Sequence, residues 1–418
     1  MNKSVNKANS SRIVAPDLAS PQFKANPYPF YARLRNEAPV WRTTTLRGRQ
    51  PVWLVTRYDD AARVLKDKIF AKDRLNAMDV EQRAKTPWMP GFLKPIERNM
   101  LDLDEPDHAR LRALVSRAFT PRLIERLRGR IETICEELLD DMERKKGRWG
   151  EVELVADFAL PLPATVIAEL LGVPAEDHVR FHRWSSQLVS VSSARDMLRF
   201  LPAALLFVRY LRRLVEQRRV DPRDDLITAL IRAEEAGDTL SEDELLAMAF
   251  LLLVAGHETT VNLISSGMLA LLEHPEQTER LIIDPSLAKL AVEELLRYTS
   301  PVELATERYA REYVEIEGTT IPRGEMVLAV LGSANRDERQ FEYPDVLDLA
   351  RDPNKHLAFG RGGVHHCLGA PLARMEAQIA LNALLRRFPD IQLATRTGSL
   401  RWRRGVFLRG LERLPLVI

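Results

Sequence analysis

Cysteine is nearly absent from this sequence, because its 418 residues include only Cys135 and Cys367. Two cysteines so far apart make no disulfide framework of the secreted type, and this usage fits a reducing cytoplasm. The start of the chain lacks the apolar core of a signal peptide, so residues 1–20 are predicted to be a flexible polar leader. The longest apolar run, Leu245 to Gly256, is too short to cross a bilayer. We therefore expect a cytoplasmic protein without a membrane anchor.

An excess of charge of either sign is also missing. The 61 basic and 59 acidic residues give a net charge of +2, which favours neither nucleic acid nor an anionic membrane as a partner. Internal repeats, low-complexity tracts and Gly/Ser linkers are absent as well, so residues 21–418 are expected to form a single domain. The hydrophobic content of 45% is sufficient for a substantial core.

Most of the sequence has the apolar periodicity of amphipathic helices. The expected helices are 107–118, 121–145, 160–171, 202–218, 224–236, 241–273, 286–298 and 370–387. Strand-like runs are few and short, and lie at 51–56, 313–331 and 405–418. The predicted fold class is therefore mainly α with small β-sheets.

One predicted helix is unusually long. Ser241 and Glu244 match a capping box, in which each side chain hydrogen-bonds the other residue's backbone N–H. The helical pattern then continues until His274 and Pro275 stop it. At the helical rise, about 33 residues span roughly 50 Å, so this helix should cross the whole molecule. Its first half is apolar on all sides, as is typical of a buried helix.

The sequence HETT interrupts this apolar helix at residues 257–260. A carboxylate and two hydroxyls in a buried helix cost free energy unless they are paired, solvated or used. One interpretation is a satisfied polar turn that faces a neighbouring helix. The other is a kink beside a cavity, because Gly256 weakens the helix and the Thr259 hydroxyl can bond the Ala255 carbonyl. The second interpretation predicts a polar notch that contains Glu258.

Cys367 lies in the segment FGRGGVHHCLGA, residues 359–370, directly before a predicted helix. The amino end of that helix would stabilise a thiolate, the form of cysteine that ligates metals. A structural zinc site needs more ligands than the cysteine with His365 and His366. Nucleophilic catalysis beside a histidine is conceivable, but a single axial thiolate to haem iron fits the pattern better. Cys135 lies on the apolar face of a helix and is predicted to be core.

These motifs resemble those of the bacterial soluble cytochromes P450, the haem-thiolate monooxygenases, over Pro27 to Ile418. The sequence AGHETT, residues 255–260, is similar to the oxygen-activation motif in the long central helix that lies over the haem in that family. The resemblance implies the cytochrome P450 fold. It also implies that Glu258 and Thr259 are the catalytic acid and alcohol, with Glu258 relaying protons from solvent.

The resemblance further implies a haem b cofactor, iron protoporphyrin IX, with Cys367 as its metal ligand. The segments 104–112 and 307–310 are similar to those that hold the haem propionates in relatives. Propionates in a largely buried pocket need cationic or hydrogen-bonding partners. The residues expected to contact the haem are His108, Arg112, Ala255, Gly256, Arg308, Phe359, His365, Cys367 and Gly369.

The cysteine segment departs from the family pattern by one residue. Phe359 and Cys367 are eight positions apart, whereas the family's usual signature has seven. Gly362 and Gly363 lie where the extra residue enters. This spacing predicts a bulged loop before the cysteine.

A second departure concerns the family's Glu-x-x-Arg pair, which EELLR supplies as Glu294 and Arg297. These residues are three apart and so share a helix face. Val346 stands where many relatives carry the arginine that completes the network around the pair. Arg351 is predicted to substitute for it.

The reaction implied by the resemblance is insertion of one oxygen atom of O2 into a lipophilic small molecule, by hydroxylation or epoxidation. A separate ferredoxin or flavodoxin with its reductase is expected to supply the electrons, and the protein is expected to be a monomer. Apolar segments that would line the pocket by analogy with the family favour a terpenoid, steroid, fatty acid or polyketide, although ordinary core packing explains the same residues equally well. These segments are 88–93, 188–201, Leu253, Val254, 302–306 and Phe407.

Two other functions stay open from the sequence. A peroxide-driven haem-thiolate peroxygenase would need no ferredoxin, but that type often lacks the acid and alcohol pair. A haem-thiolate protein that only binds a ligand or senses a gas would need no proton relay. Glu258 and Thr259 therefore favour the monooxygenase.

Overall fold

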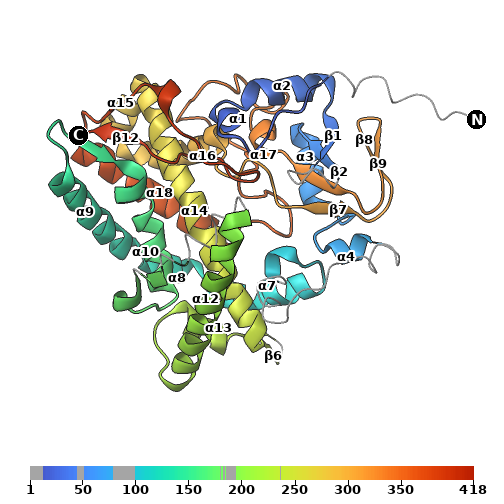
Figure 1. The fold of residues 1–418 in the computed structure, drawn as a ribbon, viewed down its shortest axis with the longest axis horizontal. Helices are drawn as coiled ribbons and strands as arrows, with labels where there is room; N and C mark the ends of the chain where they lie inside the picture. The colour runs from blue at the N-terminus through green and yellow to red at the C-terminus, as the bar shows by residue number, and fades with distance from the viewer. Residues whose placement is uncertain are drawn as a thin grey trace, which may run out of the picture.

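The computed structural model describes residues 13–44, 51–78, 99–178, 180–181, 184, 194–235 and 237–418. Most of the long helices gather on one side of the molecule, and the largest sheet lies on the other with the N-terminal helices (Figure 1). This arrangement confirms the predicted class, mainly α with small β-sheets.

The helices and strands have the following bounds. The helices are α1 Pro21–Ala25, α2 Tyr28–Glu37, α3 Tyr58–Lys66, α4 Arg74–Ala77, α7 Asp107–Ala118, α8 Pro121–Arg126, α9 Arg128–Lys145, α10 Pro161–Leu170, α12 Ala194–Val220, α13 Leu226–Arg232, α14 Glu242–Glu273, α15 Pro275–Ile283, α16 Ala288–Thr299, α17 Leu331–Ala334 and α18 Ala370–Arg387. The strands are β1 Val40–Thr44, β2 Pro51–Val55, β3 Phe70–Ala71, β4 Glu151–Glu153, β5 Glu234–Glu235, β6 Asp238–Thr239, β7 Arg308–Ala310, β8 Val314–Ile316, β9 Thr319–Ile321, β10 Met326–Ala329, β11 Gln392–Leu393 and β12 Pro415–Val417.

The helix predictions hold with three changes, and one of these is that the helix expected at 202–218 is longer and runs from Ala194 to Val220 as α12. The helices expected at 107–118 and 370–387 have these bounds as α7 and α18. The helix expected at 121–145 divides at Leu127, whose N–H bonds the Ile124 carbonyl three residues back and so tightens the turn. The helix expected at 224–236 is shorter, because α13 ends at Arg232 and the chain then forms the β5–β6 hairpin.

The largest sheet has five strands in the order β1-β2-β10-β7-β3. Strand β10 pairs parallel with β2 and antiparallel with β7, so segments more than 250 residues apart in the sequence share one sheet. Strands β11, β12 and β4 form a separate antiparallel sheet, and β8 pairs with β9. Strand β7 begins at Arg308, so this sheet fixes the position of that arginine.

Helix α14 is the predicted central helix and crosses the molecule (Figure 1). Its capping box is present: Ser241 Oγ accepts from the Glu244 N–H at 3.3 Å, and Glu244 Oε2 accepts from the Ser241 N–H at 2.8 Å. Its 32 residues have the length and composition of a membrane span, but 61% of its most apolar window is buried inside the protein. It packs against α10, α16 and α18 as a core helix.

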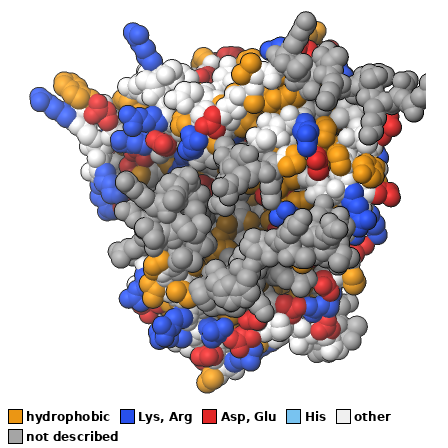
Figure 2. Space-filling model, turned by 45° about the vertical axis from the view of Figure 1, so that its right-hand side comes forward, with side chains coloured by type: hydrophobic (Ala, Val, Ile, Leu, Met, Phe, Trp, Pro, Cys, Tyr) orange, Lys and Arg blue, Asp and Glu red, His pale blue; other side chains and the backbone are white. Residues whose placement is uncertain are grey.

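The predicted polar leader lies partly outside the described residues, which begin at Ile13. In its described part, Ile13 and Ala19 are buried. On the face shown in Figure 2, described acidic and basic side chains are interspersed, as the nearly equal numbers of the two suggest. That face carries no broad field of one sign among its described side chains.

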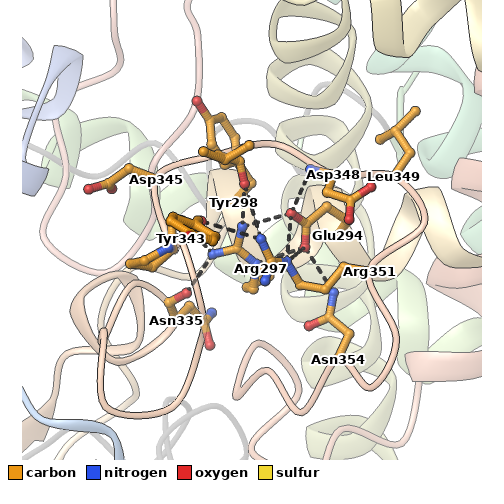
Figure 3. Close-up of polar contacts among 12 residues, drawn as sticks. Glu294, Arg297, Tyr298, Asn335, Tyr343, Asp345, Asp348, Leu349, Arg351 and Asn354 are labelled. Atoms are coloured by element: carbon orange, nitrogen blue, oxygen red, sulfur yellow. Dashed lines mark hydrogen bonds and ion pairs between the residues drawn. The ribbon is translucent and has the colours of Figure 1, made fainter.

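The Glu294 and Arg297 pair is completely buried on α16 (Figure 3). Two parallel hydrogen bonds of 2.7 Å join the guanidinium to the carboxylate. Arg297 also donates to the carbonyls of Asn335, Pro344 and Val346. The pair thus ties the irregular chain between residues 335 and 346 to α16.

Arg351 completes this network, as predicted. Its Nε donates to Glu294 Oε1 at 3.2 Å, and its Nη2 donates to the Val346 carbonyl (Figure 3). Asn354 Nδ2 and the Asp348 N–H also donate to Glu294. Val346, which stands in the family's arginine position, contributes its backbone carbonyl instead of a side chain.

A second buried carboxyl lies between α14 and α18. Glu376 on α18 is 2% exposed and shares a hydrogen bond with the Thr260 hydroxyl on α14. Burial raises the pKa of Glu376 to about 8, and the Thr260 hydrogen bond offsets only part of this rise. In the folded protein this carboxyl therefore stays protonated at neutral pH.

This pKa predicts how stability depends on pH. Because the unfolded carboxyl ionises near 4.5 and the folded one near 8, Glu376 costs about 1.4 kcal/mol of stability for each unit that the pH rises between these values. The Glu376→Gln variant lacks this penalty, so its melting temperature should fall less than that of the wild type between pH 5 and pH 8 in thermal unfolding. The control is Glu279→Gln on the exposed face of α15, which should keep the wild-type slope. Equal slopes for all three proteins would contradict the prediction.

Candidate active site

The polar turn of α14 is open in the middle of an otherwise buried helix. Leu253 and the residues from 261 to 271 are buried, whereas Ala255 and Gly256 are exposed. The Thr259 hydroxyl donates to the Ala255 carbonyl at 2.9 Å, as predicted, and the helix continues through the turn. Ala255 and Gly256 are therefore accessible at this turn, which agrees with the predicted notch, whereas the kink predicted with it stays a prediction.

Glu258 lies at the same turn and pairs with a distant arginine. Its Oε1 is 3.3 Å from Nη1 of Arg403, while its Oε2 is buried without a hydrogen-bond partner among the described residues. Burial raises the pKa of Glu258, and Arg403 offsets part of this rise. A carboxyl with a raised pKa holds its proton more strongly than an ordinary glutamate, as a group that donates protons must. The sequence did not predict a role for Arg403, because this residue is 145 positions from Glu258 and belongs to no motif.

The cysteine loop accommodates its extra residue through glycines. Gly362 has a φ of +81°, in the left-handed region that favours glycine. A Cβ on Gly363 would collide with the Leu65 carbonyl on α3, so the loop can pack here only with glycine. The Cys367 N–H donates to the Phe359 carbonyl at 2.9 Å and closes the loop. The bulge predicted from the spacing is therefore packed against α3.

Cys367 lies near the amino end of α18, where Gly369 is the N-cap. The surrounding protein desolvates the thiol and raises its pKa, while the backbone N–H groups of Gly369 and Ala370 and the charge of Arg112 lower it. The helix end thus favours the thiolate, as expected, while desolvation acts in the opposite direction with the larger effect on the pKa. A metal cation in contact with the sulfur would reverse this balance.

Five basic side chains gather beside the cysteine loop: Lys72, His108, Arg112, Arg308 and His365. The rings of His108 and His365 have centroids 4.1 Å apart. Burial, followed by the charges of the other four groups, lowers the pKa of His365 to about 2. Burial also lowers the pKa of Arg308 to about 10. The positive charge concentrated here is unfavourable for the protein by itself.

This cluster has hydrogen-bond donors that no described side chain satisfies. Arg308 donates to the backbone carbonyls of Thr306 and Glu307 at 3.4 and 3.2 Å, and it makes no ion pair within the described ranges. His108 Nε2 is buried and has no hydrogen-bond partner in the same part of the chain. A buried guanidinium such as that of Arg308 needs an anion, and the His108 ring needs a hydrogen-bond partner. The two propionates of a haem would supply that charge, so the residues present fit the group.

Lys72 is the member of this cluster that sequence reasoning missed. It is 5% exposed, and its Nζ donates to Thr306 Oγ1 at 2.8 Å and to the Glu307 carbonyl at 3.2 Å. Burial lowers its pKa to about 8. Because Arg308 donates to the same Glu307 carbonyl, the two cations lie side by side. No local pattern marks Lys72, since its burial depends on chain that is more than two hundred residues away.

The structure brings together two of the segments expected to line a substrate pocket. The N–H groups of Glu303 and Leu304 donate to the Phe407 carbonyl at 2.8 and 3.2 Å. Of the expected α14 residues, Leu253 is buried and Val254 is partly exposed. Residues 88–93 and 188–193, and the side chains of residues 194–201, lie outside what the structure describes.

Known proteins match this chain over most of its length. The family model "Cytochrome P450" matches residues 207–284 and 286–395. The chain is 47% identical over 397 residues to "Polyketide biosynthesis cytochrome P450 PksS" of Bacillus subtilis (strain 168), which covers 94% of this chain and 96% of that protein. It is 44% identical over 390 residues to "Mycinamicin IV hydroxylase/epoxidase" of Micromonospora griseorubida, which covers 93% and 94%.

Solved structures agree with these relatives. The structure of PksS from Bacillus subtilis 168 superposes with a TM-score of 0.89 at 46% identity and covers 96% of this chain and 99% of that one. The myxobacterial cytochrome P450 CYP267B1 in complex with myristic acid gives a TM-score of 0.88 at 46% identity and covers 97% and 99%. Identity of this size over nearly the whole chain shows that the protein belongs to the cytochrome P450 family, the haem-thiolate monooxygenases.

Proposed function

We propose that this cytochrome P450 hydroxylates or epoxidises a lipophilic small molecule, and that Glu258 and Thr259 deliver the protons for this reaction. The observation that carries the assignment is the open polar turn of α14. A carboxyl with one unpartnered oxygen stands there next to a hydroxyl, in the middle of a buried helix. A protein that only binds a ligand has no use for this costly arrangement.

Cys367 is the metal ligand in this proposal, and the five basic side chains hold the haem propionates. Bound haem supplies the reductive activation of O2, which the electron-rich thiolate assists. Arg308, Arg112, His108 and His365 were expected in this role, and Lys72 joins them. Ala255 and Gly256 leave space above the site, while Phe359 and Gly369 shape the loop around the sulfur.

Protons reach the reacting oxygen through α14. The Thr259 hydroxyl donates to the Ala255 carbonyl and keeps its oxygen free to accept a further hydrogen bond. Glu258, whose pKa burial raises, supplies the proton from the next position along the helix. Arg403 holds Oε1 of the Glu258 carboxyl group, so Oε2 is available to take up and release the proton.

A lipophilic substrate agrees with the names and titles of the relatives, which include polyketide, fatty-acid and steroid examples. The name of PksS refers to polyketide biosynthesis, and CYP267B1 was solved with myristic acid. The apolar segments at 302–306 and Phe407 are compatible with such a molecule. A spectral-shift screen of the ferric protein against a compound library identifies the substrate class. Binding of polar compounds alone would overturn the proposal of a lipophilic substrate.

The electron donor in this proposal is a separate ferredoxin or flavodoxin with its reductase. Arg361 is exposed in the cysteine loop and offers positive charge to an acidic donor surface. We also assign the protein to the cytoplasm, as a monomer whose residues 21–418 form one catalytic domain. Both Cys135 and Cys367 are free, which agrees with a reducing compartment.

The ligand assignment predicts a spectrum. The reduced protein with carbon monoxide should show the red-shifted Soret band for which the family is named, and Cys367→Ser should abolish it. Cys135→Ala should leave the band unchanged, because Cys135 is buried in the core and its pKa is raised to about 12 by that burial. If Cys135→Ala lost the band while Cys367→Ser kept it, the iron ligand would be Cys135, and the assignment of Cys367 would be wrong.

The basic cluster predicts how haem is lost. Arg308→Ala should leave a buried propionate without its partner, at a cost of roughly 3–5 kcal/mol for a fully buried pair. We expect lower haem occupancy in the purified protein with near-wild-type helicity by circular dichroism. Arg308→Lys should retain more haem than Arg308→Ala, and Arg122→Ala on the exposed side of α8 should match the wild type. Full occupancy in Arg308→Ala would remove this arginine from the site.

The proton-delivery role predicts uncoupling. Thr259→Ala, reconstituted with a ferredoxin system, should consume NAD(P)H at a comparable rate but form less product and more hydrogen peroxide. Glu258→Gln should slow turnover itself, by about 10²-fold for a lost general acid. Product, peroxide and NAD(P)H are measured together.

The matched control for Thr259→Ala is Ser265→Ala. Ser265 donates to the Val261 carbonyl at 2.7 Å in the same type of helical hydrogen bond, but away from the open turn. Ser265→Ala should therefore lose stability without loss of coupling. Wild-type coupling in a folded Thr259→Ala protein would refute the assigned role, and product formed as fast from hydrogen peroxide alone would favour the peroxygenase.

A further inference from the structure

A lysine of the short N-terminal helix α1 is buried together with its charge. Lys24 is completely buried, and its Nζ lies 2.7 Å from Oε2 of Glu303, whose side chain is 1% exposed. The other oxygen of this carboxylate, Oε1, accepts a hydrogen bond from the Tyr31 hydroxyl on α2. Lys24 Nζ also donates to the Val406 carbonyl at 3.0 Å. One ammonium group thus joins three parts of the chain that are far apart in the sequence.

The backbone of Glu303 is held as firmly as its carboxylate. Its N–H donates to the Phe407 carbonyl at 2.8 Å, and its own carbonyl accepts from the Gly332 N–H on α17 at 2.9 Å. A Cβ on Gly332 would lie 3.2 Å from Cγ of Glu303, so α17 also packs closely against the side chain. Every polar group of Glu303 therefore has a partner, and each partner belongs to a different element.

The segment around Phe407 is tied to the same lysine. Val406, whose carbonyl accepts from Lys24 Nζ, directly precedes Phe407. Farther along, Arg409 Nε donates to the backbone carbonyl of Lys24 at 2.8 Å, and the Arg409 N–H donates to the Pro301 carbonyl at 3.0 Å. Lys24 therefore contacts residues 405–409 through both its side chain and its backbone.

The two segments that meet at Lys24, residues 302–306 and 405–409, contain residues expected to line the substrate pocket. Val302, Thr306 and Phe407 are partly exposed in the structure. Replacing a buried ion pair by well-packed apolar side chains is often neutral or stabilising, so stability alone does not explain this pair. A charged pair imposes a fixed geometry instead, because the ammonium must stay within hydrogen-bond distance of both Glu303 and the Val406 carbonyl.

We propose that Lys24 is a positioning residue for substrate binding. Through the Glu303 carboxylate and the Val406 carbonyl it sets the distance between residues 302–306 and 405–409, and with it the width of the pocket that these segments line. Tyr31 supports this role, since it holds the second oxygen of Glu303. The inference rests on the lipophilic pocket of the proposed function. It assigns Lys24 no contact with the substrate.

Two haem ligands of different size test the proposal on the ferric holoenzyme. Imidazole needs little more than access to the iron, whereas clotrimazole also places three aromatic rings against the pocket walls. Both dissociation constants are measured from the shift of the Soret band. In Lys24→Met the constant for clotrimazole should rise about tenfold, the order expected for an apolar group that no longer fits its pocket. The constant for imidazole should not change.

Lys24→Met leaves the Glu303 carboxylate buried without its cation, and this variant can fail to fold for that reason alone. The double variant Lys24→Met with Glu303→Gln removes both charges and nearly preserves the volume of both side chains. It should show the same selective loss of clotrimazole affinity. The matched control is Lys145→Met, because Lys145 forms an exposed ion pair with Asp157 at 3.6 Å. This control should keep both wild-type constants.

Amide hydrogen exchange measures the same effect without any haem ligand. The N–H groups of Glu303 and Leu304 donate to the Phe407 carbonyl. They should exchange several-fold faster in the double variant than in the wild type, because the two segments are no longer held together. The N–H groups that join β10 to β2 should keep their wild-type protection. Unchanged exchange at Glu303 and Leu304 would contradict the proposal.

The outcomes separate this inference from the proposed function. If the folded double variant keeps the wild-type ratio of the two dissociation constants, the ion pair is only structural and the proposal fails alone, even if the melting temperature falls. If clotrimazole binds the wild type no more tightly than imidazole does, the pocket is not lipophilic. The proposed substrate class then fails, and the inference fails with it.

Discussion

The buried ion pair of Glu294 and Arg297 holds together the part of the molecule on which the site depends. Both side chains are completely buried, so each charge is stable only because the network satisfies its remaining hydrogen bonds. The donors and acceptors come from the irregular chain between residues 335 and 354. Asn335, whose carbonyl accepts from Arg297, also accepts from the Leu357 N–H through its side chain, and Leu357 leads into the cysteine loop. The position of Cys367 thus depends on an ion pair in another element.

A second set of buried charges shows the opposite pattern. In the Glu294 network every charge has a partner, whereas Arg308 donates only to backbone carbonyls and His108 retains an unpartnered nitrogen. Buried charges that are paired stabilise a fold, and buried charges that lack partners among the described residues indicate where a ligand supplies them. The first network positions the cysteine loop, and the second prepares its surroundings for an anionic cofactor.

Helix α14 contains both a part that stabilises the fold and a part that serves the site. Most of its length is apolar and buried, which fixes it in the core, and its polar turn is open where the site needs protons. The burial that stabilises the helix also raises the pKa of Glu258 and leaves its Oε2 without a hydrogen-bond partner among the described residues. The same low-dielectric surroundings therefore determine both the stability of the helix and the proton affinity of the acid.

Local sequence determined the features that depend on residues within one or two helical turns. The capping box of Ser241 and Glu244, the Thr259 hydrogen bond and the pairing of Glu294 with Arg297 were predictable because helix geometry fixes those distances. The role of Arg351, which takes the place of the arginine missing at Val346, was predictable only by comparison with the family. Tertiary structure alone decided the roles of Lys72 and Arg403, because their partners are far away in the sequence. It also decided the Cys367 pKa, since a helix end is local whereas desolvation depends on everything packed around the sulfur.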